Sequence, residues 1–116
     1  MFKLSSTQIT DLQRAEDTRN IARIAEYLRR TEAADLPPMS DIERSYLAKQ
    51  SFLRGRELGL KRRNKLCLFA FLVRETGGEA LHAPEIEEAM TSPGANPHHV
   101  LDEMVEVMKI AAEAEA

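Results

Sequence analysis

Hydrophobic residues recur at three- and four-residue intervals along most of the chain, which is the spacing of one face of an α-helix. In the first thirty residues these positions are Ile9, Leu12, Ala15, Ile21, Ile24, Ala25 and Leu28. The period is lost at 31–35, and Pro37-Pro38 cannot continue a helix. We therefore predict a first helix that is capped by Ser6 or Thr7 and ends before residue 31.

A second helix is predicted from Ser40 to Leu58. Ser40 stands three residues before Glu43, which is the spacing of a capping box. Gly59 follows this helix, and glycine is common there because it tolerates positive φ. We expect a tight corner at Gly59. The apolar positions of the helix are Ile42, Tyr46, Leu47, Phe52 and Leu53.

The most hydrophobic run of the chain, LCLFAFLV, occupies residues 66–73. A strand is the competing interpretation of so short a run, but Leu and Ala outnumber β-branched residues and the chain offers no partner strand. A helix that is apolar on most sides is usually buried by its neighbours. We therefore predict a central helix from 61–64 to Glu75, closed by Gly77-Gly78, with these residues in the core: Leu66, Phe69, Leu72 and Val73.

Two more helices are predicted near the C-terminus. Pro84 suits the first turn of a short fourth helix, and 92–94 read as a turn. Asn96-Pro97 is a cap followed by a first-turn proline, which opens a final helix whose tail, 110–116, we expect to fray. The fold class is all-α: residues 1–116 form a single domain, a small four-to-five-helix bundle with a central apolar helix.

Composition agrees with a small globular domain. The 116 residues are 43% hydrophobic and 30% charged, enough for one modest core. The run at 66–73 is too short to cross a bilayer, and the N-terminus lacks the apolar stretch of a secretory signal. The single cysteine, Cys67, excludes an internal disulfide and a Cys-rich zinc site. We expect a cytoplasmic protein that does not bind a membrane.

The net charge of −3 hides a segregation of charge along the chain. Residues 44–65 hold eight basic residues against one acid, Glu57, whereas residues 85–116 hold eight acids against one base, Lys109. The two groups could neutralise each other inside the fold or form solvated faces, or either could meet an oppositely charged partner. The candidate partner-binding residues lie around the glycine corner: Arg54, Arg56, Lys61, Arg62, Arg63 and Lys65.

No arrangement of catalytic residues accompanies these features. The adjacent His98 and His99 point about 100° apart on a helix and do not easily share a metal ion. Cys67 lies between two leucines with no neighbouring base to activate its thiol. Gly77-Gly78 lacks the Lys and Ser of a phosphate-binding loop. We expect no enzyme activity, no cofactor and no metal site.

A small DNA-binding regulator is one alternative, because basic residues at 54–65 flank a helix–corner–helix. Two features argue against it. The acid-rich C-terminal third would repel phosphate, and the helix after the corner is apolar where a recognition helix exposes polar side chains. We do not expect nucleic acid as a partner.

A further set of residues recurs in a characteristic order along the chain: Ile9, Leu12, 56–60, 69–73, Gly77-Gly78, 90–93, Pro97 and Leu101. In this order the chain resembles a family of small helical proteins encoded beside type VI secretion spike, PAAR and effector genes in Gram-negative bacteria. The segment 76–79 departs from the family pattern, in which an aromatic residue usually follows the glycine. The resemblance implies a non-enzymatic accessory factor, a co-chaperone or adaptor, that binds an effector or its adaptor protein. An immunity protein that blocks a toxin stays an alternative.

Overall fold

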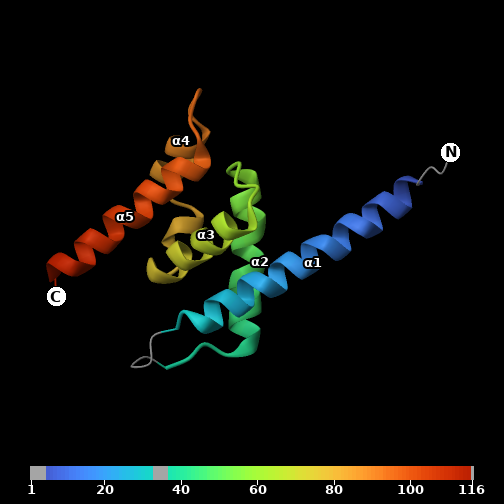
Figure 1. The fold of residues 1–116 in the computed structure, drawn as a ribbon, viewed down its shortest axis with the longest axis horizontal. Coiled ribbons are helices and arrows are strands. Elements are labelled where there is room, and N and C mark those ends of the chain that lie inside the picture. Colours follow the sequence, from blue (N-terminus) through green and yellow to red (C-terminus); the bar gives the residue numbers. More distant parts are fainter. Residues whose placement is uncertain (1–4, 33–36, 116) are drawn as a thin grey trace.

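The computed structural model describes residues 5–32 and 37–115, and over these residues the protein is all-helical (Figure 1). The predicted all-α class is confirmed, and the count of helices is five besides one 3₁₀ turn. Part of the predicted break at 31–35 lies outside the described residues. The elements are α1 (Ser6–Arg30), α2 (Asp41–Glu57), α3 (Arg63–Glu75), η1 (Glu79–Leu81), α4 (Pro84–Thr91) and α5 (Pro97–Glu115).

The cap of α1 differs from the prediction. Ser5, rather than Ser6 or Thr7, is the N-cap: its hydroxyl accepts from the Gln8 N–H at 3.1 Å. The Gln8 side chain in turn accepts from the Ser5 N–H at 2.8 Å. Three consecutive hydroxyl residues offer the same cap oxygen, but only Ser5 has a glutamine three positions later to complete the capping box.

The other helix starts follow the predicted signals. The Ser40 hydroxyl accepts from the Glu43 N–H at the start of α2. Pro84 occupies the first turn of α4. At the start of α5, the Asn96 side-chain oxygen accepts from the N–H groups of His98 and His99. The side chains of Ser40 and Asn96 thus satisfy backbone donors that have no partner inside the helix, whereas Pro84 has no N–H that would need one.

The predicted glycine corner after α2 is confirmed. Gly59 has φ of +96°, which is the left-handed region. The Leu60 N–H donates to the Gly55 carbonyl at 2.9 Å and the Gly59 N–H donates to the Arg56 carbonyl at 3.1 Å. This pair of hydrogen bonds is a Schellman motif, which ends a helix and turns the chain sharply. Gly77-Gly78 closes α3 with the same pattern of bonds.

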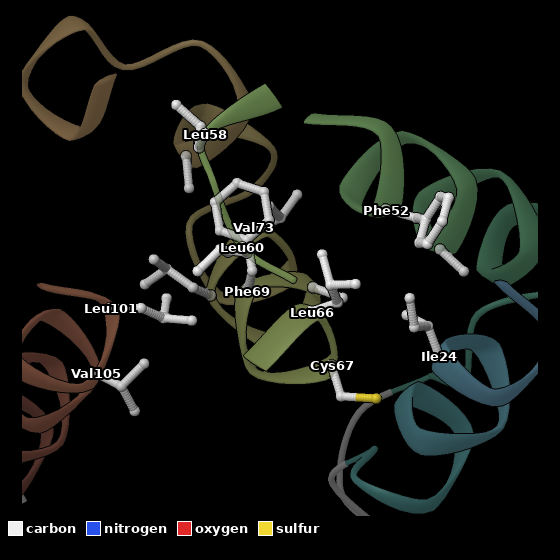
Figure 2. Close-up of a cluster of buried hydrophobic side chains, with 14 of the residues drawn as sticks. Ile24, Phe52, Leu58, Leu60, Leu66, Cys67, Phe69, Val73, Leu101 and Val105 are labelled. Atoms are coloured by element: carbon white, nitrogen blue, oxygen red, sulfur yellow. The ribbon is translucent and has the colours of Figure 1, made fainter. Parts of the chain in front are cut away.

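The core is built around α3, as predicted (Figure 2). Phe69 and Val73 are completely buried, and α3 contacts α1, α2, α5 and η1. In Figure 2, Leu101 and Val105 of α5 lie on one side of α3, while Phe52 of α2 and Ile24 of α1 lie on the other. The buried residues of α3 are Leu66, Cys67, Phe69, Ala70, Leu72 and Val73.

Buried and half-buried arginines tie the helices together. The Arg44 guanidinium of α2 lies 2.8 Å from Glu32 and 2.7 Å from Asp41, and it also donates to the Met39 carbonyl. Arg74 of α3 donates to the carbonyls of Leu28 and Thr31 at the end of α1. A buried guanidinium needs such partners, because an unpaired charge inside a protein is strongly unfavourable. The sequence pattern did not single out either arginine.

The ends of two helices extend beyond this core. All side chains from Ser6 to Glu16 of α1 are exposed, and so are those of 109–114 in α5. Figure 1 shows both ends reaching away from the other helices. The radius of gyration is 16.0 Å, against about 13 Å for a compact domain of this length. Fraying was expected over 110–116, whereas α5 continues through Glu115, and Ala116 lies outside the described residues.

Candidate functional site

Two of the six candidate basic residues form ion pairs within the fold. Arg54 donates from Nε to the Leu81 carbonyl at 2.9 Å, and its guanidinium lies 3.0 Å from Glu57 and 3.3 Å from Glu87. Lys65 Nζ lies 2.6 and 2.7 Å from the two carboxylate oxygens of Asp102.

These contacts join the basic segment of the chain to the acidic one. Arg54 connects α2 to α4, and Lys65 connects α3 to α5. The side chains of Arg54 and Lys65 are only 21% and 17% exposed. At these two positions the opposite charges therefore neutralise each other inside the fold, which was one of the possibilities left open by the sequence. Both residues position helices and offer little surface to a partner.

The other four candidates are exposed and lie together around the turn into α3. We call Arg56, Lys61, Arg62 and Arg63 the basic corner. Within residues 5–32 and 37–115, none of the four forms an ion pair with a carboxylate. The Arg56 guanidinium lies 5.6 Å from the centre of the Phe52 ring, a cation–π contact. The positive charges of these four exposed residues therefore face solvent.

The turn at Gly59 and hydrogen bonds to α5 and α1 hold the basic corner in place. Gly59 sets the direction of the chain out of α2, and the Lys61 N–H donates to His98 Nε2 of α5 at 3.1 Å. Arg63 Nε donates to Asn20 Oδ1 of α1 at 3.1 Å. Neither Asn20 nor His98 was predicted to neighbour the corner, because they lie 43 and 37 positions away along the chain. No short-range pattern could have identified them.

The local electrostatics of the basic corner are unfavourable. Arg62 is the N-cap of α3, and its side chain makes no capping hydrogen bond. The N-terminus of a helix carries a partial positive charge, so it favours anions and disfavours cations. Lys61, Arg62 and Arg63 place three further positive charges at this end. A carboxylate from outside the molecule would be attracted both by the cations and by the helix end.

The residues considered for catalysis sit in ordinary structural positions. Cys67 is buried, and burial raises the pKa of its thiol, so the reactive thiolate is disfavoured. His99 Nε2 lies 3.0 Å from the Glu103 carboxylate on the surface of α5. In the described part of the chain, no group of three His, Cys, Asp or Glu side chains could hold a metal ion. The expected lack of enzyme activity stays a prediction.

Comparison with known proteins identifies no relative of this chain. No family model, curated protein or solved structure matches the chain. The resemblance to type VI secretion accessory proteins therefore stays a hypothesis that rests on the residues named for it. None of the helices that the structure describes is long and apolar enough to cross a membrane.

Proposed function

We propose that this chain is a non-enzymatic accessory factor that binds an acidic surface of another protein through the basic corner. The observation that carries the proposal is the group of four exposed cations at the end of α2 and the start of α3, which form no ion pair with a carboxylate in the described part of the chain. The resemblance of the sequence supplies the partner class, a type VI secretion effector or its adaptor, with the chain acting as co-chaperone or adaptor.

Physical chemistry supports an acidic protein partner. The positive charges at the end of α2 are compensated by the dipole of that helix, whereas those of Lys61, Arg62 and Arg63 add to the positive end of α3. Arginine is enriched at protein interfaces, and its planar guanidinium can donate two parallel hydrogen bonds to a carboxylate. An acidic partner would therefore relieve local repulsion while it gains directed hydrogen bonds.

The surroundings of the basic corner favour a protein over nucleic acid. After its first turn α3 is buried on several sides, so it cannot lie in a DNA groove. The first turns of α5 lie beside the corner, as the contacts of Lys61 with His98 and of Lys65 with Asp102 show. A second helix therefore occupies the space beside the corner, which further limits the approach of a DNA groove.

The test is co-purification with the proteins encoded by the neighbouring genes. The affinity-tagged chain is co-expressed with the adjacent effector and adaptor, and recovery is compared for wild type and the Lys61→Glu, Arg62→Glu variant. Arg14→Glu, Lys49→Glu is the matched control, because it makes the same change of net charge at two other exposed positions. We expect the corner variant to lose most of the partner and the control to keep it, with thermal unfolding unchanged in both.

A kinetic measurement refines this test. If the interface is largely electrostatic, the association rate of the wild type falls as salt is added, and charge reversal at the corner lowers it further. Equal recovery of the same partner by both variants would remove the basic corner from the interface. Recovery of nucleic acid in place of protein would favour the regulator. Protection of cells from a co-expressed toxin, through a complex with that toxin alone, would favour the immunity protein.

A further inference from the structure

A shallow groove of about 440 Å³ lies between α4 and α5, and none of its lining residues belongs to the basic corner. Its lining is mainly apolar: Ala89 comes from α4, and α5 supplies Val100, Glu103, Met104 and Val107. Val107 is 66% exposed. Ile110, one turn further along α5, is 56% exposed. The groove therefore opens onto an apolar stripe that continues toward the end of α5.

This stripe begins at the edge of the core and continues beyond it along α5. Val100, Met104, Val107 and Ala111 follow four- and three-residue steps, so they share one side of the helix. Leu101 and Val105, which are displaced around the helix, are buried in the core, while Val100 and Met104 are partly buried and pack against its edge. In Figure 1 the second half of α5 reaches beyond the other helices. The exposed part of the stripe, from Val107 onward, does not contribute to the core of this chain.

Carboxylates border the groove on both helices. Glu103 lines it, and Glu106 and Glu113 follow along the same edge of α5 at intervals of three and seven residues. On α4, Glu85 lies one turn before Ala89 and so on the same face. All four are exposed. His99 contacts Glu103, while Lys109 lies two positions from Val107 and so on the far side of α5.

We propose that this groove binds an amphipathic helix of a partner protein, one whose apolar face is flanked by lysine or arginine. A stripe with helical spacing fits the i, i+3/i+4, i+7 anchors of a helix laid in a groove. The flexible side chain of Met104 can adapt to the shape of the anchors. The carboxylate border selects the charge of the occupant, because an acidic helix would meet like charges on both sides.

A second copy of this chain fits the groove less well. Ile9 and Leu12 lie near Asp11 and Glu16 on α1, and on α2 Ile42 stands between Asp41 and Glu43. Further along α2, the exposed Tyr46 and Leu53 do have Lys49 and Arg56 beside them, but α2 is packed against α1 and α3, so it could reach the groove of another copy only together with these helices. We take a different protein as the occupant, and self-association of the chain is the outcome that would replace it. The inference deepens the proposed protein-binding role with a second surface of opposite charge, and it does not depend on the basic corner.

The test uses two synthetic amphipathic peptides of about eighteen residues, a length at which helices form readily on a partner. They share leucines at the anchor positions and differ only in carrying lysine or glutamate at the polar ones. Fluorescence anisotropy measures their binding to the full chain. We expect saturable binding of the lysine peptide and at least about tenfold weaker binding of the glutamate peptide.

Variants then locate the binding site. Val107→Gln, Ile110→Gln should weaken binding of the lysine peptide by about tenfold or more, because it removes the apolar anchors without changing charge. Ile42→Gln, at an 84% exposed position on α2, is the matched control and should bind normally. The corner variant Lys61→Glu, Arg62→Glu should also bind the peptide. Loss of the co-purified partner in that variant therefore tests the proposed function, whereas loss of peptide binding in the groove variant tests this inference.

Several outcomes would overturn the inference. These are no binding of the lysine peptide, equal affinity for both peptides, or an equal loss in Ile42→Gln and in the groove variant. The chain alone should stay monomeric by analytical ultracentrifugation. A concentration-dependent dimer that Val107→Gln, Ile110→Gln abolishes would make a second copy the occupant and the proposed partner helix wrong.

Discussion

α1 and α3 are both regular helices, yet they contribute to the structure in opposite ways. α1 has 25 residues and buries two of them, Ile24 and Leu28. α3 has 13 residues and buries six. Figure 1 shows α3 among the other helices while the first half of α1 projects into solvent. The length of a helix therefore does not measure its contribution to the core.

The two helices also begin differently. α1 starts with a complete capping box formed by Ser5 and Gln8, whereas α3 starts at Arg62 with no side-chain cap. A cap contributes about 1 kcal/mol. Burial of one large apolar side chain contributes about 1.5–3 kcal/mol. α3 can therefore tolerate a poorly capped, positively charged start, while the exposed part of α1 depends on local interactions.

The largest expected effect compares one apolar residue from each helix. Phe69→Ala should lower the free energy of unfolding by about 3–5 kcal/mol, because it leaves a cavity in the centre of the core. Leu12→Ala, at an exposed position of α1, should change it by less than about 0.5 kcal/mol. Urea unfolding followed by circular dichroism measures both values. Similar losses for the two variants would show that α1 and α3 share the core equally.

A smaller effect is expected at the corner that leads into α3. Gly59→Val should cost about 1–2 kcal/mol, because a side chain disfavours the left-handed conformation found there. Its Cβ would also lie 3.0 Å from Pro97 Cγ of α5. Gly94→Val is the matched control: its φ is also positive, but no atom lies within 4 Å of the added Cβ. Thermal unfolding should shift more for Gly59→Val. An unchanged midpoint would mean that α3 does not depend on this corner.

The smallest effect is expected at the cap of α1. Ser5→Ala should speed hydrogen exchange of the first amides of α1 by about fivefold, the equivalent of a lost cap of about 1 kcal/mol. The amides near Ile24 and Leu28 should keep their protection, and the global free energy of unfolding should change by less than about 0.5 kcal/mol. Exchange followed by mass spectrometry resolves the two regions. Faster exchange throughout α1 would show that its first half belongs to the cooperative core.

Most of the helix boundaries could be read from the sequence, since their causes are local. Ser40, Pro84 and Asn96 act within three residues of themselves, and the hydrogen bonds at Gly59 reach back no further than Gly55. The central place of α3 was also predictable, because residues 66–73 are too apolar to remain exposed. The cap predicted at Ser6 or Thr7 lies one or two residues too late, because Ser5 alone has a glutamine three positions later to complete a capping box.

Only the tertiary structure decided which apolar residues of each helix are buried and which charged residues form ion pairs. Ile9 and Ile24 belong to the same hydrophobic period, but only Ile24 is met by α2 and α3. Likewise, Arg54 and Arg56 are near neighbours in the chain, yet only Arg54 forms an ion pair with Glu87 of α4. The local interactions that form a helix do not depend on which of its faces is later buried. Burial and ion pairing depend on segments far away in the sequence, and their positions are fixed only when the helices pack.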